Sequence, residues 1–187
     1  MTSNISLSPH FSLSEFTKSA TARSHGIKNE PAPEHVENLK ALCVHTLEPL
    51  REALRLPVVI TSGFRTKALN SKLAHSSDRS QHMLGEAADF YVGQPQVSGS
   101  KCQVSGSKCQ VSGSKCQVSG QNRRELLIKA FRTIILDESI VFDQLIIYPN
   151  FIHVSYTTHR KNRNKLIQGF GNGKYHALTR AEALMLE

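Results

Sequence analysis

The chain has 187 residues, of which 39% are hydrophobic and 20% are charged, and these values suit one compact domain rather than a multi-domain protein. Lysine and arginine number 23 against 15 acidic residues, so the formal net charge is +8. This balance favours anionic surroundings such as nucleic acid, anionic lipid or bacterial wall polymers, and charge alone does not choose among them.

Neither a membrane anchor nor a disulfide framework is expected. No stretch approaches the roughly 20 consecutive apolar residues that span a bilayer. The start, MTSNISLSPH, lacks the charged and apolar regions of a signal peptide, so we expect synthesis in the cytoplasm and no membrane insertion. Cys43 is the only one of the four cysteines that lies outside a repeat.

A seven-residue repeat interrupts the chain: VSGSKCQ occurs at 97–103, 104–110 and 111–117. Each copy offers only Val and Cys as apolar groups beside Gly and two Ser, which disfavours a coiled coil. Its cysteines lack the close paired spacing that is typical of zinc sites. We therefore predict a flexible low-complexity insertion at 94–121 within a single domain spanning 1–187.

The first half of the chain predicts helices. A short helix is expected over 14–21, with Ser14 as its cap. Pro31 opens a long amphipathic pattern, which is expected to kink at Pro49 and to end before Pro57.

Strands and shorter helices are expected next. The β-branched run PVVITS at 57–62 predicts a buried strand, and a short helix is expected over 67–73. AADFYV at 87–92 predicts a second strand, and Asn122 is the expected cap of a later amphipathic helix.

The last strands define the expected fold class. The runs 144–148 and 151–157 are separated by only two residues, which indicates an antiparallel hairpin. The basic segment 159–165 and the tail after Gly173 show no clear pattern. Helices early in the chain and strands around a hairpin predict an α+β fold with a small antiparallel sheet flanked by helices.

Three polar residues occupy positions that suggest a metal site. In SQHMLGEAADF, Gly85 permits a sharp turn that could bring His82 and Asp89 to one point. His153 lies in the β-rich run FIHVSY. Two imidazoles and one carboxylate form a catalytic-type zinc set, with a fourth position for water. Each residue alone has an ordinary alternative: a strand histidine packs on a sheet, and an aspartate caps or pairs with arginine.

Arg65 lies in TSGFRTKALN, directly after a predicted strand and a glycine. Its planar guanidinium offers paired donors that suit a carboxylate, such as the free C-terminus of a peptide. Considered by itself, Arg65 is better described as a solvated surface cation.

Three segments, SGFRTKALN, SQHMLGEAADF and FDQLIIYPNFIHVSY, resemble in order and spacing the zinc D-alanyl-D-alanine carboxypeptidases that share the Hedgehog/DD-peptidase fold. FSLSEFTKSATA and LEPLREAL look like the subgroup found in bacteriophages and prophages. The resemblance runs from about Phe11 to Tyr156, apart from the repeats, and its most specific part is His-x-x-Gly-x-Ala-x-Asp at 82–89.

This resemblance implies roles for individual residues. His82, Asp89 and His153 would bind Zn²⁺, Arg65 would hold a substrate carboxylate or carbonyl, and Ser80 would support its loop or contact substrate. The bond cleaved would be a peptide bond in peptidoglycan stems or cross-links, D-Ala-D-Ala or L-Ala-D-Glu in related enzymes.

The general base departs from the family pattern. Relatives commonly place a Glu or Asp three residues before the second histidine, where this chain has Asn150, and an amide cannot accept the proton of water. Asp143 is the nearest upstream carboxylate and our candidate base, and Glu86 is another. Alternatively, the metal-activated water acts with little assistance, or activity has been lost.

Two rival functions follow. A non-catalytic, zinc-containing wall-binding module would keep the ligands and need no base, which Asn150 favours. Nucleic-acid binding by 159–165 lacks aromatic interleaving, so we expect no specific nucleic-acid partner. We expect a monomer that meets peptidoglycan peptides in the bacterial wall after phage-type release or as a virion component.

Overall fold

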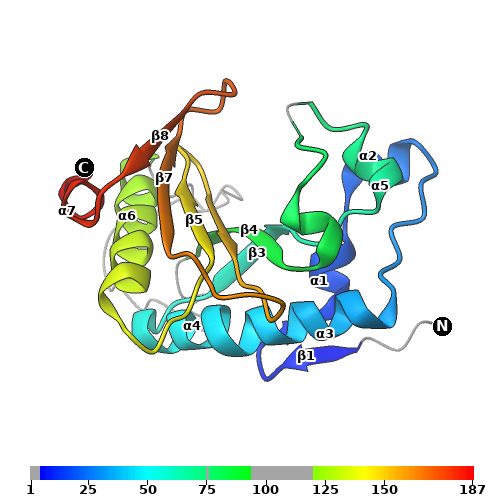
Figure 1. Cartoon of the computed structure of the whole chain (residues 1–187), viewed down its shortest axis with the longest axis horizontal. Helices are drawn as coiled ribbons and strands as arrows, with labels where there is room; N and C mark the ends of the chain where they lie inside the picture. Colours follow the sequence, from blue (N-terminus) through cyan, green and yellow to red (C-terminus); the bar gives the residue numbers. More distant parts are fainter. Residues whose placement is uncertain (1–4, 75, 94–119) are drawn as a thin grey trace, which may run out of the picture.

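The computed structural model describes residues 5–74, 76–93 and 120–187 (Figure 1). Almost all of the predicted insertion at 94–121 lies outside these ranges, so its flexibility stays a prediction. The described residues form helices and two sheets, which confirms the α+β class. Among them, no helix combines the length and apolar character needed to cross a bilayer.

The larger sheet has six strands in the order β3-β4-β6-β5-β7-β8. Its strands are β3 (Val58–Ser62), β4 (Ala87–Val92), β5 (Gln144–Ile147), β6 (Ile152–Ser155), β7 (Lys165–Gly169) and β8 (Tyr175–Leu178). All neighbouring pairs are antiparallel except β5 and β7, which are parallel. The expected hairpin of β5 and β6 is confirmed.

The larger sheet differs from the expected small antiparallel sheet, because the chain continues into β7 and β8 and the sheet becomes mixed. After β6 the chain returns to the free edge of β5 and runs in the same direction as β5. Sequence patterning missed β7 because it directly follows a basic loop, and it missed β8 because β8 is an edge strand whose side chains are mostly exposed.

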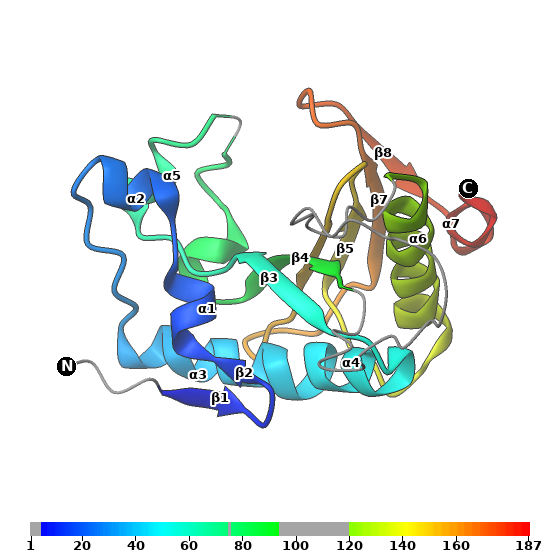
Figure 2. The same ribbon diagram turned by 180° about the vertical axis from the view of Figure 1, so that it is seen from behind.

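The N-terminal part builds a separate group of small elements. They are β1 (Ser6–Ser8), β2 (Phe11–Ser12), α1 (Leu13–Thr17), α2 (Ala20–Ser24) and α5 (Lys67–Asn70). Figures 1 and 2 show α1, α2 and α5 at the end of the molecule opposite α6 (Gly120–Leu136) and α7 (Arg180–Met185). Two helices replace the single one expected over 14–21, because Lys18 is extended and the Ser19 hydroxyl caps α2.

The expected long helix is interrupted by a wider turn rather than by a simple kink. It consists of α3 (Pro33–Leu42), a π-helical turn η1 (Cys43–Leu47) and α4 (Glu48–Leu54). Pro49 has no N–H to donate to the carbonyl of His45, and that carbonyl instead accepts the N–H of Val141 at 3.0 Å. The turn therefore joins this helix to the segment that leads into β5.

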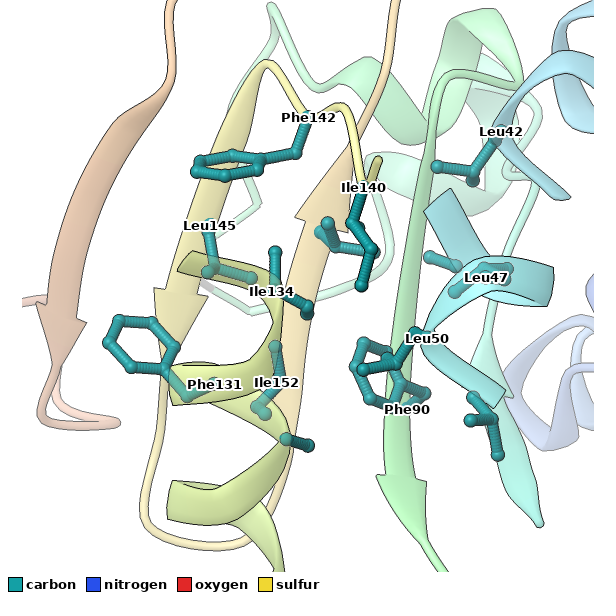
Figure 3. Packing of buried hydrophobic residues seen from close by; sticks show 14 of the residues in the cluster. Leu42, Leu47, Leu50, Phe90, Phe131, Ile134, Ile140, Phe142, Leu145 and Ile152 are labelled. Atoms are coloured by element: carbon teal, nitrogen blue, oxygen red, sulfur yellow. The ribbon is translucent and has the colours of Figure 1, made fainter. Parts of the chain in front are cut away.

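The hydrophobic core lies on one face of the larger sheet. Figure 3 shows Phe131 of α6 near Leu145 of β5, and Leu50 of α4 near Phe90 of β4. The core-facing residues alternate along the strands and include Ala88, Phe90, Leu145, Ile147, Ile152 and Val154. Because side chains alternate between the two faces of a strand, Asp89, Ile146 and His153 point to the opposite face.

The end of β4 and the start of α6 are also in contact. The guanidinium carbon of Arg123 lies 4.3 Å from the centre of the Tyr91 ring. A cation above an aromatic face is attracted by the ring quadrupole. Tyr91, before the predicted insertion, and Arg123, after it, therefore lie close together.

Candidate metal centre

Three chain segments place His82, Asp89 and His153 together. Asp89 on β4 and His153 on β6 are direct partners in the antiparallel register, and they share the face opposite the core. His82 comes from η2, a 3₁₀ turn spanning Gln81–Leu84 just before β4. The convergence expected from the sequence is therefore present.

The candidate ligand atoms lie close together and away from solvent. His153 Nδ1 is 2.9 Å from Asp89 Oδ1, and His82 Nε2 is 3.3 Å from the same oxygen. The two imidazole nitrogens are 3.2 Å apart, and all three ligand atoms lie within 4.8 Å of one another. The side chains of His82, Asp89 and His153 are only 4%, 11% and 12% exposed.

The orientation of His82 is fixed by the backbone of the loop after β3. Its Nδ1 lies 2.7 Å from the carbonyl oxygen of Gly63, and since a carbonyl only accepts, Nδ1 carries the proton. Nε2 is then the nitrogen with the free lone pair. Burial lowers the pKa of His82 below its ordinary value although Asp89 opposes this, so the ring is neutral and suited to bind a metal.

Arg65 holds the far side of the Asp89 carboxylate. Its Nη2 donates to Asp89 Oδ2 at 2.9 Å, and its Nε and Nη2 donate to the Ser62 hydroxyl at 3.1 and 2.9 Å. Its backbone N–H donates to the carbonyl of His82 at 3.1 Å. Arg65 therefore orients two of the three candidate ligands, and its role toward substrate stays a prediction.

The charge of Asp89 is stabilised by its surroundings. Burial alone would raise the pKa of Asp89, but attraction to His82 in its protonated form and the hydrogen bond with His153 outweigh burial and hold the pKa well below its ordinary value. The carboxylate is therefore ionised, with Oδ1 toward the imidazoles and Oδ2 toward Arg65. Two imidazoles and one carboxylate provide the three protein ligands of a catalytic zinc site, so the residues fit such an ion.

A glycine makes the turn between His82 and Asp89 possible. Gly85 ends η2 with a φ of +71°, a region that favours glycine. A Cβ at this position would lie 2.5 Å from the carbonyl oxygen of His35 at the start of α3. Gly85 thus satisfies a backbone requirement and a packing requirement at the same point.

Comparison with protein-family models shows to which family the chain belongs. The family model for Peptidase M15 matches residues 9–125, more than half of the chain. The chain belongs to the peptidase M15 family. The matched stretch includes Arg65, Ser80, His82 and Asp89, whereas His153 lies beyond it and is brought to the site by the sheet. A search of curated proteins finds no match.

Membership of the M15 family confirms the resemblance at family level. The family consists of zinc-dependent peptidases, and the His-Asp-His group supplies a matching metal site in this chain. The Hedgehog/DD-peptidase fold and the phage and prophage subgroup are finer assignments, and they stay predictions.

Ser80 and Asn150 are not part of the group of candidate ligands. Ser80 is the N-terminal cap residue of η2, and its backbone carbonyl accepts the N–H of Met83 at 3.0 Å. Its side chain makes no capping hydrogen bond, so the role of the Ser80 hydroxyl stays a prediction. Asn150 is exposed in the turn between β5 and β6.

The two carboxylates considered as general bases are engaged elsewhere. Asp143 is fully buried, and its carboxylate binds the guanidinium groups of Arg160 and Arg163. Glu86 is 2% exposed and accepts hydrogen bonds from the Thr157 hydroxyl at 2.6 Å and from the Gln81 amide at 3.2 Å. Within the described residues, neither is hydrogen-bonded to the candidate ligands.

Asp143 anchors the connection that produces the parallel strand pair. Its backbone carbonyl accepts the N–H of Lys165 at the start of β7, while its side chain holds the preceding basic loop. Burial would raise the pKa of Asp143, but the hydrogen bonds from Arg160 and Arg163 outweigh it and hold the pKa below its ordinary value. The surroundings of Asp143 thus favour a structural role over the predicted catalytic one.

We expect Asp143→Asn to lower the free energy of unfolding by about 2 kcal/mol at pH 7, less than the cost of breaking a fully buried pair because both arginines are about half exposed. Because the folded-state pKa is depressed, this stabilisation exists above the ordinary aspartate pKa of about 3.9 and is lost as pH falls below it. Urea unfolding at pH 7 and at acid pH measures this difference. Wild-type stability combined with lost peptidase activity would instead identify Asp143 as the base.

We expect Arg65→Gln to weaken zinc binding by about 10- to 100-fold, as is typical when a partner that orients a ligand is removed. The reason is that Asp89 Oδ2 loses its charged donor. Competition with a chromophoric chelator measures the affinity, and Arg79→Gln, an exposed arginine on the following loop, is the matched control. Unchanged zinc affinity with impaired substrate binding would restrict Arg65 to the substrate.

Some contributors to the site carried no sequence signal. Gly63 acts through its backbone carbonyl, which no side-chain pattern reveals. Ser62 supports Arg65 through a hydroxyl that the sequence presents only as part of a strand.

Proposed function

We propose that this protein is a zinc peptidase that cleaves stem or cross-link peptides of peptidoglycan, at D-Ala-D-Ala or L-Ala-D-Glu bonds. The observation that carries the proposal is the convergence of His82 Nε2, Asp89 Oδ1 and His153 Nδ1 in a chain of the M15 family. The formal charge of +8 supports a substrate embedded in anionic wall polymers.

Each residue at this site has a distinct role in the proposed reaction. When bound, zinc supplies a Lewis acid and lowers the pKa of a bound water toward about 7. The Gly63 carbonyl keeps His82 in the tautomer that presents Nε2, and Arg65 keeps Asp89 aimed at the imidazoles. Arg65 Nη1 has no hydrogen-bond partner within the described residues, so this nitrogen is our candidate donor to a substrate carbonyl or carboxylate.

The second candidate function is a non-catalytic, zinc-containing module that binds the bacterial wall. It is favoured by Asn150, which occupies the expected position of the general base, and by the engagement of Asp143 and Glu86 in other contacts. In either function the protein would meet the wall after phage-type release or as a virion component.

Mass spectrometry of purified peptidoglycan tests both functions. Zinc-loaded protein is incubated with peptidoglycan beside chelator-treated protein and His153→Ala. Fragments that require the metal and His153 support the peptidase and identify the bond. Intact muropeptides, together with one bound zinc per chain and sedimentation of the protein with insoluble wall, would support the binding module instead.

A further inference from the structure

We propose that the phenolic O–H of Tyr148 donates a hydrogen bond to the carbonyl oxygen of the scissile peptide as negative charge develops on it. This inference rests on the proposed peptidase function and assigns a further catalytic residue to the same site. It does not replace the missing carboxylate as a base: the phenol would stabilise the transition state by donation rather than accept a proton.

The register of the sheet places Tyr148 on the face that carries the metal centre. Leu145 and Ile147 of β5 belong to the core, so Ile146 and Tyr148 point to the other face. Ile146 is the direct partner of His153, and the Tyr148 N–H donates to the carbonyl of Phe151 at 2.9 Å. Tyr148 and His153 are therefore diagonal neighbours, a separation within reach of an aromatic side chain.

The ring of Tyr148 is held in one orientation. It stacks on Phe151 with ring centres 4.3 Å apart and an angle of 18° between the planes. Its edge occupies the space that a Cβ at Gly169 would need, so β7 can pass only because residue 169 is a glycine. The Arg124 guanidinium also donates to the Tyr148 carbonyl at 3.2 Å. Donors fixed in advance stabilise developing charge without reorganisation during the reaction.

The hydroxyl itself has only a weak partner. It lies 3.3 Å from the hydroxyl of Tyr175, longer than the usual 2.5–3.0 Å range for such a bond. Tyr175 is an exposed residue of β8. The Tyr148 proton can therefore move to a stronger acceptor, and an oxygen that gains negative charge is one.

Electrostatic surroundings keep this phenol protonated. Burial raises the pKa of Tyr148 above its ordinary value, and the hydrogen bond with Tyr175 and the charge of Asp89 add to the shift, while Arg65 opposes it. At neutral pH Tyr148 is thus a donor.

The first test compares Tyr148→Phe with wild-type protein, both loaded with zinc. Phenylalanine keeps the stacking on Phe151, so we expect unchanged folding and zinc content. On the peptidoglycan fragment that wild-type protein cleaves, we expect kcat to fall by about 100-fold, with KM little changed. The matched control is Tyr156→Phe, because the Tyr156 ring stacks on His45 instead. An unchanged kcat would overturn the proposal.

The second test does not depend on turnover. Calorimetry measures binding of phosphinate analogues, in which a tetrahedral phosphorus replaces the scissile carbonyl carbon of D-Ala-D-Ala or L-Ala-D-Glu. A hydrogen bond to a charged group corresponds to about 10- to 100-fold in affinity, so we expect Tyr148→Phe to bind that much more weakly. Equal affinities would overturn the inference, as would failure of wild-type protein to bind either analogue.

The two tests separate the inference from the function on which it rests. Wild-type protein that leaves peptidoglycan intact but binds a phosphinate through Tyr148 would refute the proposed reaction and retain the role of the phenol as donor. Active wild-type protein with an equally active Tyr148→Phe variant would retain the peptidase and refute that role.

Discussion

His153→Ala is expected to bind zinc far more than 100-fold more weakly than wild-type protein, and to lose any metal-dependent peptidase activity. The upper value for removing an outer partner of a ligand is about 100-fold, and this variant removes a ligand itself. His153 Nδ1 lies 2.9 Å from Asp89 Oδ1 and 3.2 Å from His82 Nε2, so its loss leaves only two candidate ligands. A chelator-competition titration measures the affinity.

The control for this variant is His176→Ala on β8, since His176 is exposed and outside the ligand group. It should retain one zinc per chain with unchanged affinity. Circular dichroism of both variants verifies that the sheet is intact. If His153→Ala bound zinc as tightly as wild-type protein, the metal would have to be held by other residues, and the proposed site would be wrong.

Gly85→Ala is expected to lower the free energy of unfolding by about 2–5 kcal/mol. A left-handed backbone costs a residue with a side chain about 1–2 kcal/mol, and forcing an atom into a packed space costs about 1–3 kcal/mol more. At Gly85 both apply, because φ is +71° and the new Cβ would lie 2.5 Å from the His35 carbonyl oxygen. Urea unfolding measures the change.

Gly171→Ala separates these two contributions. Gly171 has a φ of +75°, and nothing lies within 4 Å of the position its Cβ would take, so we expect a loss of only about 1 kcal/mol. Gly85→Ala should also weaken zinc binding, because relief of the clash displaces η2 and with it His82. Equal costs at the two glycines would show that packing of η2 against α3 contributes little.

The sequence was most informative where local chemistry is distinctive. The spacing from His82 through Gly85 to Asp89 predicted a turn followed by a strand, and the structure contains η2, a left-handed glycine and β4. His153 was recognisable as a candidate ligand because it is a polar side chain within a β-branched run. The register of β4 and β6 then decided that these residues meet.

Features that depend on distant contacts could not be predicted in this way. The parallel pairing of β5 with β7 is set by the connection that Asp143 anchors, and nothing in the short β7 sequence indicates its partner. Asp143 is a second example. In the sequence nothing distinguishes it from a free carboxylate, whereas in the structure it is buried and bound by two arginines. The ion pair between Arg65 and Asp89 is likewise a contact between two segments whose proximity the sequence did not indicate.

The contact between Tyr91 and Arg123 bears on how the repeats can be accommodated. These residues lie before and after the insertion and are close together, so the segments that lead into and out of the insertion are near each other. For a loop without fixed structure, the entropy of closure grows only with the logarithm of length, about 0.6 kcal/mol per doubling. Gain or loss of one VSGSKCQ copy would therefore change stability by a fraction of a kilocalorie per mole, so the number of copies can drift while β4 and α6 keep their places.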